Sequence, residues 1–292
     1  MTHYPVQELE PAAWPPLLKE IPQPPTTLNY RGILPPPDLP LIAVVGSRKY
    51  TTYGKQVVEY LIDGLRGCQV GIVSGLALGI DGLAHEAALR AGLYTLSIPG
   101  SGIADSVLYP RTNRSLATRI LEAGGGLLSE YEPTFKATKW SFIQRNRLMA
   151  GLCQATLIIE ATAQSGTLTT ARMAVDYNRE LLAVPGSIFS ASTRGTHQFL
   201  KLGATMVAEP ADIIELLALE PTNATPTKFA APTATDLSDA EINLLNALAE
   251  PADVNTIIRR SGEATTTVSV TLMSLELRGY IGNENGVYRR LR

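Results

Sequence analysis

Cysteine and histidine are scarce in this 292-residue chain, which holds two cysteines and three histidines. Cys68 and Cys153 have neither metal-site nor disulfide-framework spacing, so we expect two buried, free thiols in a reducing cytoplasm. His3, His85 and His197 lie far apart in the sequence, which disfavours a zinc site. The sequence therefore predicts no metal and no other cofactor.

Long apolar runs are also missing. The longest runs, such as 41–45 and 156–161, are far shorter than the roughly 20 residues of a membrane span. The first residues show no basic start followed by an apolar stretch and a small-residue cleavage site. We therefore expect a soluble, cytoplasmic protein that has no membrane partner.

Three common ligand-binding motifs are absent as well. The first glycine-rich turn, "VVGSRKYTTYG", lacks the GxGxxG spacing of NAD-binding proteins. Neither GxxxxGK[ST] nor GxSxG occurs. These absences disfavour a dinucleotide enzyme, a P-loop ATPase and a serine hydrolase.

Composition divides the chain into four parts. Residues 1–40 contain 11 of the 20 prolines, so we expect an extended or loosely draped arm. Residues 41–219 form the main body. Residues 220–236, rich in Thr, Ala and Pro, are typical of a linker, and residues 237–292 predict three short helices and a terminal hairpin.

The main body alternates short aliphatic runs with amphipathic stretches. This alternation predicts an α/β fold with a doubly wound parallel sheet. The expected strands are "LIAVVG", "VGIVSG", "TLSIPG", "LLSE", "TLIIEA", "LLAVPG" and "TMVAE".

Most expected strands end in a loop of small residues. The carboxyl ends of parallel strands share one edge of the sheet, and glycines there let backbone N–H groups approach a phosphate. Parallel sheets need tight turns in any case, so a single loop of this kind is weak support. Together, several such loops favour a ligand with a polyphosphate backbone. The loops are 46–48, 74–79, 99–102, 165–167 and 185–187.

A basic and aromatic cluster occupies the acid-free stretch between Glu132 and Glu160, in a chain of net charge −2. Cations beside aromatic rings are typical of grooves for single-stranded nucleic acid. The alternative is that the rings belong to the core and the arginines to a solvated helix face. The cluster consists of Lys136, Lys139, Trp140, Phe142, Arg145 and Arg147.

Helical spacing separates the roles within this cluster. Lys139 and Phe142, three residues apart, share one side of a helix, whereas Arg145 and Arg147 do not. We expect Arg147 to pair with an acid such as Glu160, and Asn146 to hydrogen-bond to a turn.

Asp81 and His85 invite a catalytic interpretation. Asp81 follows Gly79 and precedes an alanine-rich helix, so we expect an N-cap. His85, one turn later, is expected to hydrogen-bond to a neighbouring loop.

Seven motifs resemble the DNA-processing protein A family, also called DprA or Smf, in the order in which they occur there. They lie within Leu41 to Leu217 and are "VVGSRKYTTYG", "IVSGLALGIDGLAHEAAL", "YPRTNRSL", "LLSEYEP", "FIQRNRLMAGL", "LIIEATAQSGTLTTARMA" and "LLAVPGSI". The resemblance implies an extended Rossmann fold. It also implies a protein that is not an enzyme, binds single-stranded DNA, forms dimers and loads the recombinase RecA during natural transformation.

The same resemblance implies roles for individual residues. Arg48, Lys139 and Phe142 would contact DNA, while the RNR motif and the Ser165–Thr167 loop would shape the pocket. The candidate DNA-binding residues are Gly46, Ser47, Arg48, Lys139, Phe142, Arg145, Asn146, Arg147, Ser165, Gly166 and Thr167.

Two regions outside the pocket carry further expectations. Phe199, Leu200 and Met206 fall near the last strand of the body, where exposed apolar surface and the family resemblance both point to a homodimer interface. The tail resembles the winged-helix module of some members. The sterile-alpha-motif-type domain that many members carry before the body has no counterpart in residues 1–40.

The rival interpretation is an enzyme. Related Rossmann proteins that cleave nucleotide derivatives have a loop similar to "SGTLTTA", followed soon by a glutamate. Here Leu168, Thr169, Thr170 and Ala171 follow instead, which disfavours that activity.

Overall fold

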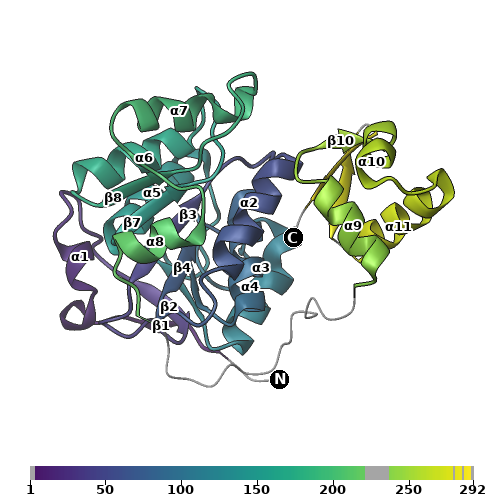
Figure 1. Ribbon diagram of the computed structural model, residues 1–292. Coiled ribbons are helices and arrows are strands. Elements are labelled where there is room, and N and C mark those ends of the chain that lie inside the picture. The colour runs from purple at the N-terminus through teal and green to yellow at the C-terminus, as the bar shows by residue number, and fades with distance from the viewer. Residues whose placement is uncertain (1–3, 221–236, 279, 285, 291–292) are drawn as a thin grey trace. The chain divides into compact units, whose positions relative to one another are not determined.

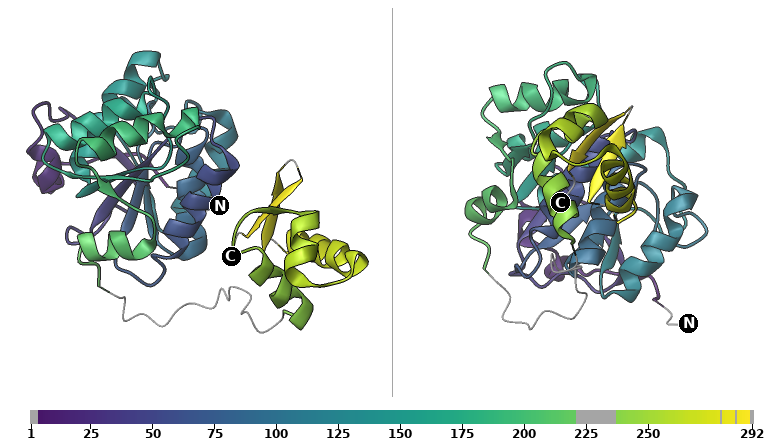
Figure 2. Two further views of the ribbon diagram at one scale, coloured as in Figure 1. Left: turned by 45° about the horizontal axis from the view of Figure 1, so that its top comes forward. Right: turned by 45° about the vertical axis from the view of Figure 1, so that its right-hand side comes forward.

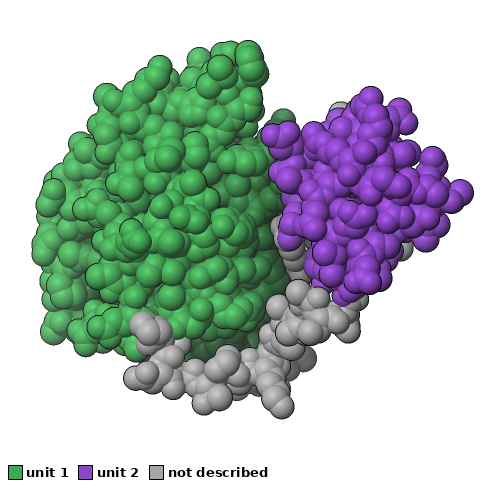
Figure 3. Space-filling view, viewed as in Figure 1, with its two compact units in different colours: residues 1–225 green, residues 226–292 purple. Residues whose placement is uncertain are grey.

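The computed structural model describes residues 4–220, 237–278, 280–284 and 286–290. The chain divides into two compact units, residues 1–225 and 226–292 (Figure 3). Apart from residue 220, the linker expected at 220–236 lies outside the described residues.

The larger unit is built on a nine-stranded sheet, and all seven strands expected from the sequence are confirmed. Their order in the sheet is β6-β5-β4-β3-β7-β8-β9, and all seven run parallel (Figure 1). They span β3 (Leu41–Val45), β4 (Gly71–Ser74), β5 (Tyr94–Ser97), β6 (Gly126–Ser129), β7 (Ala155–Ile158), β8 (Glu180–Ala183) and β9 (Thr205–Met206).

Helices cover both faces of this sheet (Figure 2). Helices α2 (Thr52–Asp63), α3 (Ile80–Ala91) and α8 (Pro210–Leu216) pack on one face, with α4 (Arg114–Glu122) beside α3. Helices α5 (Lys139–Leu152), α6 (Thr167–Asp176) and α7 (Arg194–Lys201) cover the other face. This arrangement confirms the doubly wound fold.

The central strand explains why the aliphatic runs are continuous rather than alternating. In β3, Leu41, Ala43 and Val45 face the core under α5 and α6, while Ile42 and Val44 face the core under α2 and α3. Successive side chains of a strand point to opposite faces, so a strand covered on both faces must be apolar throughout.

The proline-rich arm is folded against the sheet rather than draped. It contains β1 (Gln7–Glu8), a 3₁₀ turn (Pro11–Ala13), α1 (Pro16–Lys19) and β2 (Asn29–Gly32). Strand β2 pairs antiparallel with β6, and Trp14, Leu18, Ile21 and Leu28 are buried in the main core. The prolines do not distinguish the two arrangements in the sequence, because they are compatible with both an edge strand and a loose arm.

The smaller unit confirms the expected three helices and hairpin. Helices α9 (Asp239–Ala247), α10 (Val254–Ser261) and α11 (Thr265–Leu277) surround their own apolar core. Strand β10 (Ala252–Asp253) pairs with β12 (Val287–Arg290), which pairs with β11 (Ile281–Glu284). This is the arrangement of a winged helix.

The two cysteines of the larger unit do not form a disulfide. Both are free thiols, Cys153 buried and Cys68 partly exposed. Within the described ranges, no three His, Cys, Asp or Glu side chains gather in a group that could hold a metal ion. None of the described helices is long and apolar enough to cross a membrane.

His85 of α3 is fully buried and bonds a strand rather than a loop. Its Nδ1 lies 2.7 Å from Thr95 Oγ1, whose own proton is donated to the Ile72 carbonyl at 3.0 Å. Burial lowers the pKa of His85 to about 3 from its ordinary 6.5.

This burial predicts a pH dependence of stability. Between pH 6.5 and about 3 the unfolded chain takes up a proton at His85 that the folded chain excludes, so stability falls as the pH falls. The loss is about 1.4 kcal/mol per pH unit, or roughly 2 kcal/mol between pH 7.5 and 5. Urea unfolding at both pH values, followed by the fluorescence of Trp14 and Trp140, should show this drop and a smaller one for His85→Asn. An equal drop in both proteins would contradict the burial of a neutral imidazole.

Candidate nucleic-acid interface

The loops after β3 and β7 border a cavity of about 500 Å³ at the carboxyl edge of the sheet. The strand order reverses between β3 and β7, and open α/β sheets bind ligands at such a switch point. We call this space the switch-point cavity. Its lining includes Gly46, Ser47, Arg48, Lys49, Asp81, Phe142, Ile143, Arg145, Asn146, Thr162, Ser165, Gly166, Thr167, Thr170 and Ser192.

Two of these loops are joined directly. Thr167 Oγ1 donates to the Gly46 carbonyl at 3.2 Å, and Ser165 Oγ donates to Thr167 Oγ1 at 2.9 Å. Gly46 has no room for a side chain, because a Cβ there would lie 2.6 Å from Ile80 of α3. The first loop is thus pressed onto α3 and bonded to the loop after β7, so Arg48 projects from a fixed base.

Glu160, just past the end of β7, connects further loops. Its carboxylate is fully buried and accepts from the Thr51 N–H at 3.0 Å, the Thr51 hydroxyl at 2.5 Å and the Ser192 hydroxyl at 3.1 Å. Thr51 caps α2 after the first loop, and Ser192 belongs to the loop after β8. Gly54 leaves space for the carboxylate. One buried acid therefore ties together the loops after β3, β7 and β8.

The start of α5 is fixed over the turn that follows β5. Thr138 and Ser141 form a reciprocal capping box, and Ser141 Oγ also donates to the Gly100 carbonyl at 2.6 Å. Phe142 comes next and packs its ring on Gly100, where a Cβ would lie 2.5 Å from the ring. The cap and the glycine together place Phe142 at the mouth of the switch-point cavity.

Phe142 and Arg48 form a cation–π pair. The Arg48 guanidinium carbon lies 5.0 Å from the ring centroid, and the Tyr109 ring lies 5.8 Å away on a tilted plane. Arg48 and Tyr109 are exposed, while Phe142 is half-buried. The three side chains come from three segments distant in sequence and form a cationic and aromatic group.

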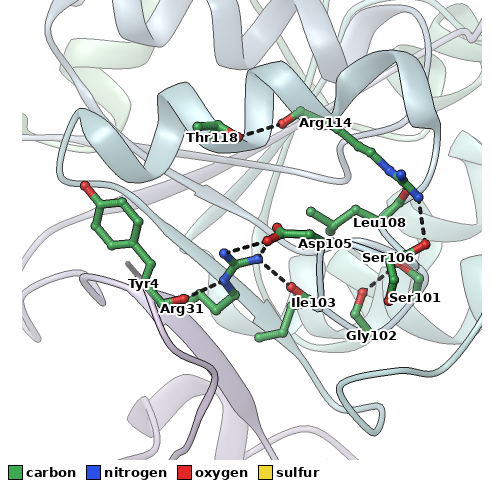
Figure 4. Close-up of polar contacts among 10 residues, drawn as sticks. All are labelled: Tyr4, Arg31, Ser101, Gly102, Ile103, Asp105, Ser106, Leu108, Arg114 and Thr118. Atoms are coloured by element: carbon green, nitrogen blue, oxygen red, sulfur yellow. Dashed lines mark hydrogen bonds and ion pairs between the residues drawn. The ribbon is translucent and has the colours of Figure 1, made fainter. Parts of the chain in front are cut away.

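Two arginines hold the turn from Ile103 to Leu108, which directly precedes Tyr109 (Figure 4). Arg31 of β2 donates to the Ile103 carbonyl at 2.9 Å and pairs with Asp105 at 2.6 Å. Arg114 of α4 donates to two backbone carbonyls further along the turn, at 2.7 and 3.1 Å. The N-terminal arm thus braces the aromatic end of the site.

Arg145 and Arg147 are both buried, so neither is a solvated helix face. Arg145 lines the cavity from inside and donates to the Ile98 carbonyl. Burial lowers the pKa of Arg145 to about 10, and Asp81 opposes that shift. The guanidinium therefore remains charged at neutral pH in the lining of the cavity.

Arg147 does brace the structure, but its partner is Glu130 at the end of β6 and not the expected Glu160. Helix α5 crosses from β6 to β7, and Arg147 faces back toward the strand that precedes the helix. Glu160 is instead occupied by Thr51 and Ser192. Helical periodicity correctly indicated that Arg145 and Arg147 point in different directions. It does not determine which acid forms an ion pair with Arg147.

Asp81 is not the N-cap of α3. Gly79, with φ of 85°, occupies that position, and Asp81 lies buried in the first turn, where it lines the cavity. Burial raises the pKa of Asp81, while Arg145, the Ala77 backbone and Arg48 oppose the rise. The electrostatic attraction between Asp81 and Arg145 thus offsets part of the cost of burying each group.

The structure gathers most, but not all, of the candidate DNA-binding residues. Lys139 and Arg147 do not line the cavity; Lys139 is exposed in the first turn of α5, beside the exposed Trp140. Sequence reasoning missed Lys49, Thr162 and Ser192. Only Lys49 had a signal, because it directly follows the Gly46–Arg48 loop.

The expected dimer residues differ in exposure. Phe199 is buried in the core at 6% exposure, Leu200 is half-buried and Met206 of β9 is 56% exposed. Strand β9 ends the sheet, and the neighbouring Leu202 is 80% exposed. A groove of about 490 Å³ lies here, lined by Phe199 and Leu202 among others.

Comparison with protein families agrees with this architecture. Residues 7–218 match the model of DNA recombination-mediator protein A, and residues 228–286 match that of the DprA winged helix domain. The first match takes in most of the proline-rich arm.

Curated relatives support the same assignment. Protein Smf of Escherichia coli is 36% identical over 255 residues, which cover 86% of this chain and 68% of Smf. The DNA processing protein DprA of Streptococcus pneumoniae is 40% identical over 199 residues, 68% of each chain.

Two solved structures are similar to this chain. DNA processing protein A from Streptococcus pneumoniae has a TM-score of 0.66 at 37% identity and covers 73% of this chain and 74% of its own. DNA processing protein A from Helicobacter pylori, described in its single-stranded DNA binding mode, has a TM-score of 0.64 at 31% identity. The match covers 74% of this chain and 97% of the Helicobacter pylori chain. This chain belongs to the DNA recombination-mediator protein A family, whose members include the DprA and Smf proteins.

Proposed function

We propose that this chain binds single-stranded DNA at the switch-point cavity and acts in DNA recombination and natural transformation. The observation that carries the proposal is the Arg48–Phe142 pair at the mouth of that cavity. A guanidinium can meet a phosphate while the adjacent ring stacks on an unpaired base. The relative from Helicobacter pylori, which binds single-stranded DNA, supports the same ligand here.

The chemistry of the site favours a single strand over a duplex. Bases of a duplex are stacked on each other, so the Phe142 ring has a base to receive only when the strand is unpaired. The small side chains of the Ser165–Thr167 loop also line the cavity and leave room for the strand's backbone, while their hydroxyls hold the loop to Gly46. None of these contacts reads a base edge, so we expect little sequence preference.

We propose that the cavity binds without catalysis. Asp81, the one acid in its described lining, is buried beside Arg145, and His85 is fully buried against Thr95. The residues after Thr167, from Leu168 to Ala171, supply no carboxylate for the chemistry of nucleotide-cleaving relatives. Hydrolysis of a nucleoside monophosphate by the purified chain would contradict this view.

Phe142→Ala should weaken binding of single-stranded DNA by about 5- to 150-fold, because stacking on an aromatic ring contributes roughly 1 to 3 kcal/mol per base. Fluorescence anisotropy with an oligothymidylate measures the change. The matched control is Trp140→Ala, an exposed ring of the same helix that does not line the cavity, which should bind as the wild type does. If Phe142→Ala melts several degrees lower yet binds DNA normally, the ring belongs to the core.

We also propose that the protein is cytoplasmic, forms a homodimer and delivers DNA to RecA. The family resemblance supports the dimer and the delivery to RecA, and the two free cysteines support the cytoplasm. The exposed β9 edge with Met206 and Leu202 also supports the dimer. Faster assembly of RecA on single-stranded DNA in the presence of this chain would support the delivery step, and no effect would argue against it.

Met206→Glu should convert the dimer to monomers, because it places a charge on the exposed edge without disturbing a buried side chain. Sedimentation velocity at micromolar concentration measures the mass, and circular dichroism checks that the variant is folded. A wild type that sediments as a monomer would remove the dimer from the proposal.

A further inference from the structure

Phe189, in the loop after β8, is 90% exposed, the highest value among the large apolar side chains of the described residues. The adjacent Ile188 is 74% exposed. Full exposure of an aromatic ring forgoes the stabilisation that burial of its apolar surface would give. Isolated exposed rings are common, so the surroundings of Phe189 decide whether it has a role.

The loop that carries Phe189 is held in place rather than free. Thr193 Oγ1 donates to the Ser187 carbonyl at 2.6 Å and also lies 3.1 Å from the Ser190 carbonyl, so it holds the loop together across the ring-bearing residue. The Phe189 N–H lies 3.3 Å from Ser187 Oγ, its acceptor. The ring is therefore presented outward by a bonded backbone, as a binding platform requires.

This loop belongs to the edge that holds the switch-point cavity. Ser192, three residues after Phe189, lines the cavity and bonds to Glu160. Tyr53 of α2 donates to the Pro185 carbonyl at 2.6 Å, a second link between the loops after β3 and β8. Phe142 stands over the turn after β5, on one side of the switch point between β3 and β7. The loop that carries Phe189 follows β8, on the other side of the switch point.

The loop segments along this path carry cations and no acids. The segments 46–58, 161–175 and 181–208 contain no Asp or Glu, although the chain as a whole has a net charge of −2. They contain Arg48, Lys49 and Arg194, all exposed. An exposed ring among cations and without acids fits a polyanion that carries aromatic bases better than it fits an apolar protein surface.

We propose that Phe189 is a second base-stacking platform, so that a single strand runs from Phe142 across the loops after β3 and β7 and ends on Phe189. The inference rests on the proposed function and extends it by a named residue and a direction along the sheet edge. It predicts that oligonucleotides too short to reach both rings are indifferent to Phe189.

Competition binding with unlabelled oligothymidylates of 3 to 15 nucleotides, on the full chain, tests the proposal. Phe189→Ala should weaken binding of the long oligonucleotides by about 5- to 150-fold and leave the shortest unchanged. Phe189→Leu, which keeps apolar bulk but lacks the ring, should lose as much, and Phe189→Tyr should bind as the wild type does. Tyr60→Ala, which removes an exposed ring near the carboxyl end of α2, is the matched control and should have no effect.

Each other outcome has a definite meaning. Phe189→Ala that binds every length normally overturns the inference, and Phe142→Ala still tests the proposed function independently. If Phe189→Ala weakens the binding of all oligonucleotide lengths equally, Phe189 is not a second stacking platform. It then acts at the same binding position as Phe142. Unchanged DNA binding with altered sedimentation would assign Phe189 to a protein contact instead. A wild type that binds no oligonucleotide would contradict the proposed function itself.

Discussion

The candidate site depends on one buried carboxylate. Glu160 stands at the switch point of the sheet and accepts three hydrogen bonds, two from Thr51 and one from Ser192. A buried charge is costly unless hydrogen bonds satisfy it, so the loops after β3 and β8 are held close to β7 to meet that need. The position of Arg48, three residues before Thr51, follows from this constraint, as does that of the loop bearing Phe189.

Much of this arrangement could be predicted from the sequence, because it follows from local rules. Continuous aliphatic runs such as Leu41–Val45 mark strands buried on both faces, and the small residues after them mark the binding edge. The order of motifs identified the family, and with it the Arg48, Phe142 and Ser165–Thr167 group that the structure brings together at one cavity. Local patterns also predicted the three helices and the hairpin of the smaller unit, in which Ser238 caps α9 and Asp253 caps α10, whereas the winged helix was identified from the family resemblance.

What could not be predicted depends on contacts between distant segments. Arg147 was expected to reach Glu160, yet Glu130 lies closer to it because α5 begins its crossover at the end of β6. The proline-rich arm gave no periodic signal, although β2 extends the sheet and Arg31 braces the Tyr109 turn. Likewise, nothing in the sequence around Phe189 separates an exposed ring from a core residue, since exposure is set by the loop that Thr193 closes.

The most direct test of the central claim is the single-stranded DNA affinity of Glu160→Gln. The side chain is fully buried and cannot touch DNA, so it can act only through the loops. The amide would place a donor opposite Thr51 or Ser192, a loss of roughly 1 to 3 kcal/mol in hydrogen bonding. We expect a folded variant that binds an oligothymidylate at least threefold more weakly, while Glu180→Gln at the opposite end of β8 binds normally. Wild-type affinity in folded Glu160→Gln would show that the loops are organised by something other than this carboxylate.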